Sequence, residues 1–237
     1  MIIHNCEQGT PEWIKLRLGI PTASMFSKIL TAKTAKLSDQ SDAYLHLLLA
    51  EWISGQPVED FENDWTRHGH EYEAEARAAY EVYANAEVAQ VGFVTTDDGL
   101  VGASPDGLVG DAGAVELKCL KANNHVGYML SKSMEDKYRP QLQGQLWVCQ
   151  REYVDIQSYC PGYPTVVFRV ERDEEYIGKL EKAIGEFVER MMEAREKLES
   201  KYGPFTRRVV EVVEEDHLGI TDEDLDAILQ ARNNGTE

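Results

Sequence analysis

The stretch VGASPDGLVGDAGAVELKC, residues 101–119, places a carboxylate directly after a proline and then runs Glu-Leu-Lys along a predicted strand. Glycine-rich turn residues at 110–113 separate two apolar runs, a pattern typical of a β-hairpin. Successive strand side chains point to opposite faces, so we expect Glu116 and Lys118 to project together while Leu117 enters the core. Strand pairing would bring the carboxylate of Asp106 near that of Glu116.

Two carboxylates that converge in a pocket repel each other unless one is protonated or a cation bridges them. Oxygen ligands of this kind suit Mg²⁺, and the backbone carbonyl of Leu117 could add one more. Lys118 would then orient a water or stabilise the charge that develops on a phosphoryl group. The hairpin thus favours metal-dependent phosphodiester hydrolysis, although Asp-Gly turns and Glu-x-Lys strands also occur in purely structural hairpins.

A third carboxylate, Glu73, lies on a predicted helix ahead of the hairpin, among other glutamates that would simply face solvent. It could approach Asp106 and Glu116 from another layer of the fold. With His68 and His70 it could instead form a site for a transition metal. Helix entry and core packing are the alternative roles for the two histidines.

Two further groups of side chains are candidates for the same site. One predicted helix carries three glutamines, at least one of which is expected to line a polar cleft: Gln141, Gln143 and Gln145. A terminal phosphate is typically bound by a guanidinium, which can donate two hydrogen bonds to it, and by hydroxyl groups. The candidates for these roles are Arg17, Ser24 and Ser104.

Periodicity and punctuation predict an α/β (α+β) domain, because helices, a strand hairpin, a helix, two strands and a helix follow one another. Tyr72, Ala76, Ala79 and Tyr83 mark the clearest apolar stripe, and Ser41 or Asp42 is expected to cap the third helix. The predicted helices are 10–19, 21–30, 41–55, 70–85, 138–150, 173–201 and a terminal one at 219–235 capped by Thr221. The predicted strands are 86–96, 100–110, 113–120, 153–160 and 165–172.

Charge is distributed unevenly along a chain whose net charge is -18. Residues 209–237 hold nine acidic side chains against Arg232 alone, whereas residues 13–38 hold five basic side chains and no acidic one. The local field of the basic segment could attract phosphate despite the acidic total. No long apolar run predicts a membrane span, and the N-terminus lacks a targeting signal, so we expect a cytoplasmic protein. The four cysteines are too far apart for a C-x-x-C metal site.

Seven blocks, in order, resemble the phage lambda exonuclease family, the YqaJ-like viral recombinase nucleases of the PD-(D/E)xK superfamily. The blocks span about residues 6–195: EQGTPEWIKLRLGIPTAS, YLHLLLAE, HGHEYEAEAR, GASPDGL, AVELKC, PQLQGQLWV and ERDEEY. This resemblance implies a restriction-endonuclease-like fold with a central mixed sheet flanked by helices. It places the nuclease domain at 1–202 and leaves 203–237 as an acidic helical extension.

The resemblance also implies an activity and a set of roles. Family members degrade linear double-stranded DNA from 5′ to 3′, release 5′-mononucleotides and leave a 3′ single strand for an annealing protein. Two Mg²⁺ ions, with Mn²⁺ as a substitute, would be held by Asp106, Glu116 and the Leu117 carbonyl. Lys118 would act on the attacking water, with help from Glu73 and Gln141.

The resemblance further implies a 5′-phosphate pocket of Arg17, Ser24 and Ser104, with Trp13 as a candidate DNA contact. Asn124 stands where the family has an arginine in this pocket, and Lys121 or a later lysine would have to substitute for it. Family kinship also implies a homotrimeric ring threaded by DNA, an annealing partner and a phage or prophage gene in a bacterial host. A structure-specific endonuclease and a non-catalytic DNA-end-binding module are the alternatives to the exonuclease.

Overall fold

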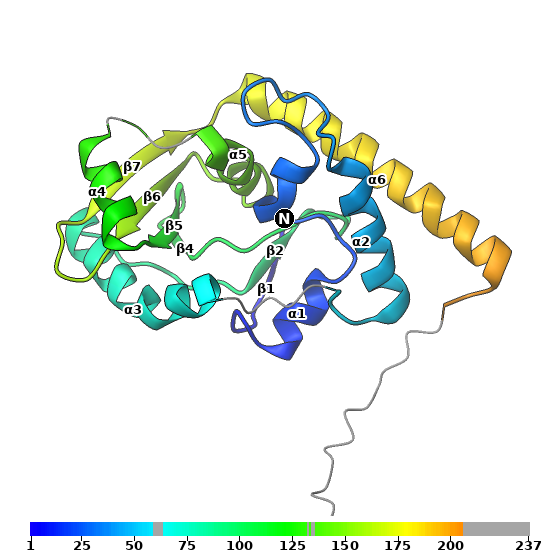
Figure 1. Ribbon diagram of the computed structural model, residues 1–237, viewed down its shortest axis with the longest axis horizontal. Coiled ribbons are helices and arrows are strands. Elements are labelled where there is room, and N and C mark those ends of the chain that lie inside the picture. The colour runs from blue at the N-terminus through cyan, green and yellow to red at the C-terminus, as the bar shows by residue number, and fades with distance from the viewer. Residues whose placement is uncertain (59–63, 132, 134–135, 206–237) are drawn as a thin grey trace, which may run out of the picture. The chain divides into compact units, whose positions relative to one another are not determined.

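The computed structural model describes residues 1–58, 64–131, 133 and 136–205, and it describes residues 64–71 by backbone alone (Figure 1). Contacts divide the chain into Met1–Arg207 and Arg208–Glu237. The second unit, with the predicted helix at 219–235, lies outside the described residues, as do the side chains of His68 and His70. Within the described ranges, no helix combines the length and apolar composition needed to span a bilayer.

Strands form two sheets, and the larger is the mixed sheet that the family resemblance implies. In the larger sheet the order is β4-β5-β6-β7, with β5 and β6 parallel and the two outer pairs antiparallel. The smaller sheet is the antiparallel set β1-β2-β3. The strands are β1 (Ile2–His4), β2 (Phe93–Thr95), β3 (Gly102–Ala103), β4 (Gly107–Val109), β5 (Gly113–Cys119), β6 (Tyr153–Tyr159) and β7 (Val166–Glu171).

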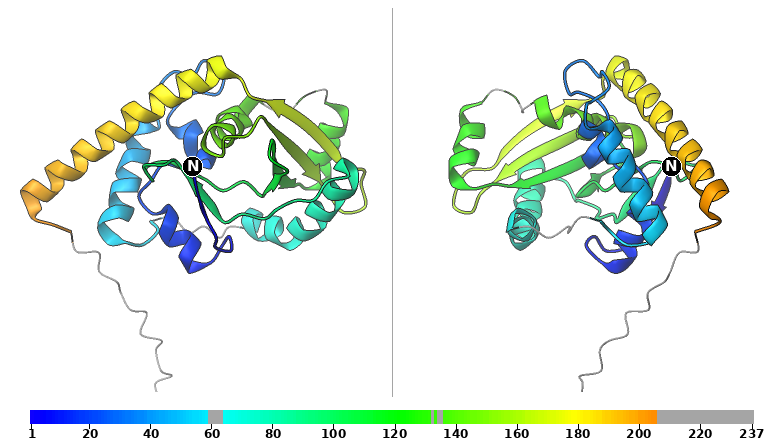
Figure 2. Two further views of the ribbon diagram at one scale, coloured as in Figure 1. Left: turned by 180° about the vertical axis from the view of Figure 1, so that it is seen from behind. Right: turned by 45° about the vertical axis from the view of Figure 1, so that its right-hand side comes forward.

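Several helices begin and end near the predicted positions, but the predicted helix 21–30 is a 3₁₀ turn at Ala23–Lys28, and the helix predicted at 70–85 begins at Asp64. Thr10 caps α1, Asp173 caps α6, and Gly55 ends α2 in the left-handed conformation. The helices are α1 (Pro11–Arg17), α2 (Ser41–Ser54), α3 (Asp64–Ala84), α4 (Ala122–Leu130), α5 (Arg139–Val148), α6 (Glu174–Tyr202) and the short 3₁₀ turns η1 (Ala23–Lys28) and η2 (Asp136–Tyr138). The long α6 packs beside α2, as the views from both sides show (Figure 2).

Strand β5 separates two apolar cores, because its side chains alternate between the two faces of the sheet. Val115 and Leu117 pack against Ala76 and Tyr80 of α3. On the other face, Ala114 joins the large core formed with η1, α2, α5 and α6. The prediction that Leu117 enters a core while its two neighbours face the other way is therefore confirmed.

Several local predictions were wrong. The predicted strand 86–96 is a strand only at Phe93–Thr95, and 100–110 divides into β3 and β4 around Ser104–Asp106, where the chain leaves one sheet for the other. The N-cap of α2 is Gln40, not Ser41 or Asp42. On α3, Tyr80 is fully buried and Tyr83 is 60% exposed. The buried face of the helix therefore includes Ala76 and Tyr80 but not Tyr83. Strand β1 and helix α4 had no counterpart in the prediction.

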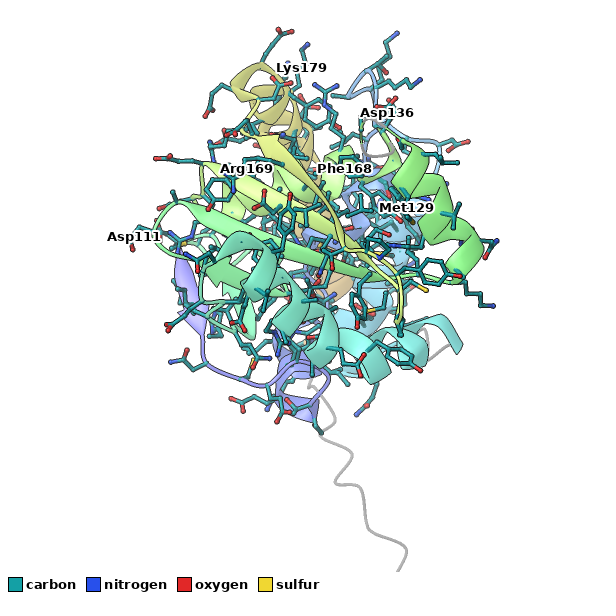
Figure 3. All side chains as sticks on the ribbon, turned by 90° about the vertical axis from the view of Figure 1, so that its left-hand side faces the viewer. Asp111, Met129, Asp136, Phe168, Arg169 and Lys179 are labelled. Atoms are coloured by element: carbon teal, nitrogen blue, oxygen red, sulfur yellow. The ribbon has the colours of Figure 1, made fainter. Side chains whose placement is uncertain are left out.

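Buried polar groups join α3 to the sheet at Asp155, which is 3% exposed. Its carboxylate accepts hydrogen bonds from Tyr80 Oη at 2.8 Å and from Arg169 Nε and Nη2 at 2.9 and 2.8 Å. Arg169, labelled on β7 in Figure 3, lies directly across from Asp155 and stacks on Tyr153. Burial of Tyr80, together with its hydrogen bond to Asp155, raises the pKa of its hydroxyl.

We expect Asp155→Asn to lower the free energy of unfolding by about 2–3 kcal/mol, because an amide cannot accept all three hydrogen bonds. The value lies at the low end for a broken buried pair, since water can still reach the guanidinium of Arg169, whose side chain is 50% exposed. Urea denaturation would measure it. Glu175→Gln, which breaks the exposed Lys179–Glu175 pair, is the control and should change stability by less than about 0.5 kcal/mol. Equal effects of the two substitutions would contradict the prediction.

Candidate active site

The β4–β5 hairpin sets Asp106 opposite Glu116. Gly107 pairs with Val115 in the antiparallel ladder, so the residues just beyond this pair, Asp106 and Glu116, face each other where the ladder ends. Asp106 Oδ2 accepts a hydrogen bond from the backbone N–H of Leu117 at 2.5 Å, which fixes its carboxylate beside β5. The predicted meeting of the two acidic residues is therefore present.

The two carboxylates are close enough to influence each other's charge. Burial raises the pKa of Asp106 well above its usual value, and the negative charge of Glu116 raises it further; Lys118 and the Leu117 N–H act in the opposite direction. The same negative potential reaches Cys119, whose pKa is raised to about 12 by burial and by Asp106. A site with this potential favours a bound cation.

Lys118 lies on the same face of β5 as Glu116. Its Nζ donates to Glu116 Oε1 at 2.5 Å and lies 5.4 Å from the centre of the Tyr138 ring. Burial alone would lower the pKa of Lys118, but the charges of Glu116 and Asp106 outweigh burial and raise it. Glu116 and Asp106 therefore favour the charged form of Lys118.

Helix α5 turns two of its three glutamines toward Glu116. Gln141 Nε2 donates to Oε1 at 2.7 Å, as expected for a residue of the site, and Gln145 Nε2 donates to Oε2 at 2.6 Å. Gln143 faces the other way, where it donates to the Glu171 carbonyl and accepts from the Asp173 N–H. The four-residue spacing of Gln141 and Gln145 was the signal that could have singled out Gln145.

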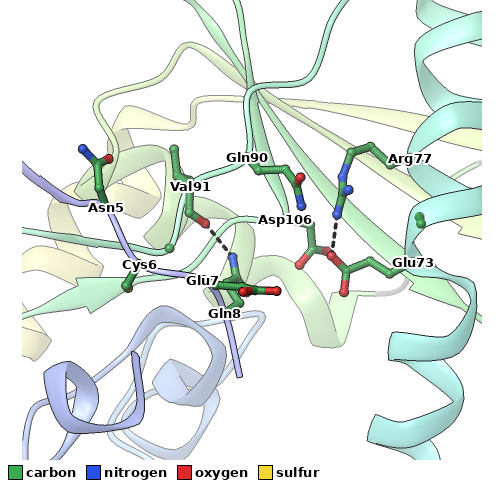
Figure 4. Close-up of a pocket in the computed structure, with 11 residues that line it drawn as sticks. Asn5, Cys6, Glu7, Gln8, Glu73, Arg77, Gln90, Val91 and Asp106 are labelled. Atoms are coloured by element: carbon green, nitrogen blue, oxygen red, sulfur yellow. Dashed lines mark hydrogen bonds and ion pairs between the residues drawn. The ribbon is translucent and has the colours of Figure 1, made fainter. Parts of the chain in front are cut away.

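A cavity of about 610 Å³ opens beside the hairpin and is lined by both Asp106 and Glu73 (Figure 4). Glu73 reaches toward it from α3, and Arg77, one turn further along, donates to Glu73 Oε1 at 2.7 Å. Glu73 therefore shares the cavity with Asp106, as predicted, while its carboxylate is paired with a cation. Arg77 was not predicted.

Gln8, also unpredicted, connects the N-terminal segment to the loop that carries Asp106. Its Nε2 donates to the carbonyls of Val91 and Pro105, both at 2.9 Å. Pro105 immediately precedes Asp106, so the amide of Gln8 restrains the backbone at that carboxylate. This bond links residues almost a hundred positions apart, which no local pattern could reveal.

Two residues of the predicted phosphate pocket lie together. Arg17 Nη1 donates to Ser104 Oγ at 2.9 Å, and Trp13 Nε1 donates to the same hydroxyl at 3.0 Å. The guanidinium of Arg17 stacks over the Trp13 ring, and its Nε is buried without a hydrogen-bond partner among the described residues. Burial lowers the pKa of Arg17 to about 10, so it remains charged at neutral pH.

The other predicted pocket residues are placed differently. Ser24 is exposed on η1 and its hydroxyl contacts Thr22, which bridges to Gly102, two residues before Ser104. Lys121 is exposed at the start of α4. Asn124 lines a second hollow of about 550 Å³ with Lys137 and Tyr138. That hollow adjoins Lys118 through the Tyr138 ring, and it does not include Arg17.

The carboxylates present fit a hard cation held by few protein ligands. In the part of the chain whose side chains are described, no three His, Cys, Asp or Glu side chains gather closely enough to hold a metal ion. The candidate ligands are thus the paired Asp106 and Glu116, with the Leu117 carbonyl next to them in sequence. One or two carboxylates completed by water and substrate oxygens is a usual environment for Mg²⁺.

Solved structures with the same fold are exonucleases. The alkaline exonuclease LHK-Exo of Laribacter hongkongensis matches with 29% identity and a TM-score of 0.72, over 81% of this chain and 97% of that one. Its complex with dAMP matches over the same shares with 30% identity and a TM-score of 0.73. A phage-related exonuclease from Haemophilus somnus 129PT, 16% identical with a TM-score of 0.58 over 74% and 96% of the two chains, shares the fold. Fold and site thus define an enzyme of the nuclease class.

Residues 12–152 match the family model of the YqaJ-like viral recombinase domain. The match covers more than half of the chain and includes the hairpin, Lys118 and both glutamines that contact Glu116. The chain belongs to this family, which confirms the resemblance inferred from the sequence. A comparison with curated proteins found no match.

Proposed function

We propose that the protein is an Mg²⁺-dependent exonuclease that degrades one strand of linear double-stranded DNA from 5′ to 3′. It would release 5′-mononucleotides and leave 3′ overhangs for recombination by strand annealing. The observation that carries the proposal is the pairing of Asp106 with Glu116 at the end of the β4–β5 ladder, with Lys118 on the same face as Glu116. The complex of LHK-Exo with dAMP, a deoxynucleoside monophosphate, supports a product of this kind.

Each residue of the hairpin has a role that its contacts support. Asp106 and Glu116, with the Leu117 carbonyl, would hold one or two Mg²⁺ ions, with Mn²⁺ as a substitute. When bound, the metal lowers the pKa of a water and neutralises charge on the scissile phosphate. Lys118, fixed in its charged form by Glu116, orients the attacking water and stabilises the negative charge that develops on the phosphate.

Two more side chains support the hairpin. Gln141 holds Glu116 Oε1, the oxygen that Lys118 also contacts, and so fixes the position of both. Glu73, across the cavity from the hairpin, helps to position metal or water. The hydrogen bond from Arg77 orients its carboxylate in the cavity that Glu73 lines with Asp106.

We assign end recognition to Arg17 and Ser104, both contacted by Trp13, and keep Ser24 and Lys121 as further proposed members of the pocket. The Nε of Arg17, which finds no partner in the described ranges of the chain, supports this assignment, because a buried donor without a partner is costly unless a ligand satisfies it. Asn124 lines the separate hollow beside Tyr138, so Arg17 is the cation that contacts Ser104 in the proposed pocket.

Assembly and partners follow from the family alone. We propose a homotrimeric ring that encloses duplex DNA, together with a single-strand annealing protein, in the cytoplasm of a bacterial host that carries the gene on a phage or prophage. A ring would reconcile a net charge of -18 with a polyanionic substrate, because DNA would meet only the local field of the bore and its metal ions.

The deciding experiment compares linear and covalently closed circular duplexes of one sequence, each with Mg²⁺ and with a chelator. The exonuclease is expected to degrade only the linear DNA and only with metal. Cleavage of the circle would favour the structure-specific endonuclease instead. DNA-end binding without any cleavage would favour the non-catalytic module.

Arg17→Met is expected to reduce the preference for a 5′-phosphate over a 5′-hydroxyl end by about 10- to 100-fold, because hydrogen bonds to charged groups contribute about 1.5–3 kcal/mol each. Rates on the two kinds of end, measured at low DNA concentration, would give the preference. Lys15→Met removes an exposed cation on the same helix and is the control. An unchanged preference in Arg17→Met would remove Arg17 from the phosphate pocket.

A further inference from the structure

The Glu116 carboxylate is held from both ends by the amides of α5. Gln141 and Gln145 are one helical turn apart, and each donates through Nε2 to a different oxygen of Glu116, at 2.7 and 2.6 Å. We propose that Gln145 is a positioning residue that fixes the orientation in which Glu116 binds the divalent metal. This inference rests on the metal site of the proposed function.

When Gln145 donates to Glu116 through Nε2, its Oε1 is left in a buried position. The residue is 1% exposed, and its Oε1 is buried without a hydrogen-bond partner in the described part of the chain. The opposite amide orientation would place Oε1 against the carboxylate of Glu116, where two acceptors repel. A side chain needed only for packing would be apolar at this depth, since an unpaired buried acceptor destabilises the fold.

The helix backbone cannot easily shift to replace this contact. Gln143 ties α5 to the Glu171 carbonyl and the Asp173 N–H, which belong to the connection between β7 and α6. A Cβ on Gly144 would lie 2.5 Å from the ring of the fully buried Phe26, so helix and η1 are in direct contact there. The contact at Gly144, next in sequence to Gln145, therefore sets the reach of Gln145 to Glu116 even when the hydrogen bonds of Gln143 are absent.

Loss of the amide would leave Glu116 restrained at one oxygen only. Lys118 and Gln141 both contact Oε1, so Oε2 would lose its donor and the carboxylate could rotate about its own axis. Groups that orient metal ligands in this way typically change metal affinity by about 10- to 100-fold when they are removed. The effect should therefore appear in metal binding itself, before any DNA is present.

The experiment measures Mn²⁺ binding to the DNA-free full chain by isothermal titration calorimetry, with Gln145→Met as the test and Gln143→Met as the matched control. Both substitutions replace a buried glutamine of the same helix by a side chain of similar shape. Gln145→Met is expected to weaken Mn²⁺ binding by about 10- to 100-fold. Gln143→Met is expected to lower the thermal unfolding temperature while Mn²⁺ affinity stays within about twofold of the wild type.

The outcomes separate this inference from the proposed function. Wild-type affinity in a folded Gln145→Met protein would overturn the role of Gln145 and leave the metal site intact. An equal loss of affinity in both variants would also overturn it, because the effect would then come from the helix. Failure of the wild type to bind Mn²⁺ would overturn the metal site itself. Should Gln145→Met not fold, Gln145→Asn, whose amide is too short to reach Glu116, carries the same test.

Discussion

Asp106→Asn is expected to reduce the rate of DNA cleavage by about 1000-fold or more, the scale seen when a group that acts on the transition state is removed. Asparagine keeps the size of the side chain and can still accept from the Leu117 N–H, so the hairpin should be preserved. The lost charge removes one of the two carboxylates that face each other at the end of the ladder. Digestion of a labelled linear duplex at saturating Mg²⁺ would measure the effect.

Stability provides the control for Asp106→Asn. Burial and the charge of Glu116 raise the pKa of Asp106 in the folded protein, so above that pKa its ionised form opposes folding. Without metal, the neutral Asn variant should therefore be at least as stable as the wild type at alkaline pH, and the wild type should gain stability as the pH falls and Asp106 takes up a proton. An active Asp106→Asn enzyme would refute the proposed metal site.

Lys118→Met is expected to lower kcat by about 100- to 1000-fold, because it removes a charged donor that acts on the developing phosphate charge. Metal binding should respond differently. Lys118 contacts Glu116 Oε1 at 2.5 Å, and its removal leaves that oxygen more available to a cation. Mn²⁺ affinity is thus expected to be preserved or increased while turnover is lost.

Single-turnover kinetics beside calorimetric Mn²⁺ titration would measure the two quantities for Lys118→Met. Lys137→Met is the control, because Lys137 also lies over the Tyr138 ring but does not contact Glu116 in the structure described. A Lys118 variant that lost metal affinity and turnover together would show that Lys118 maintains the site and does not act in the chemical step.

The hairpin and the meeting of its charged side chains could be predicted because their determinants are local. Turn residues separate β4 from β5, period-two alternation places Glu116 and Lys118 on one face, and antiparallel pairing then brings Asp106 across from Glu116. Helix ends with a side-chain cap or a left-handed glycine, such as Asp173 and Gly55, were predictable for the same reason. Metal identity, strand polarity of digestion and the ring stay predictions.

Other features depend on contacts between distant segments. Gln8 reaches the Asp106 loop, and the packing of α5 on η1 decides that the face with Gln141 and Gln145, and not the one with Gln143, turns toward Glu116. The burial of Tyr80 in place of Tyr83 follows from its hydrogen bond to Asp155 on a strand 75 residues away. Short strands such as β3 carry too few residues to show a pattern of their own.

The alternation along β5 has a consequence for how such a gene can change. Replacing a side chain in this strand alters one contact, but inserting or deleting one codon between Gly113 and Glu116 would exchange the two faces beyond that point. Glu116 and Lys118 would then enter the apolar core against α3, and Leu117 would occupy the face of the proposed metal site. Insertions and deletions among relatives should therefore be confined to loops. In a library of variants that each carry a one-codon insertion or deletion, few variants with the change in β5 should be active.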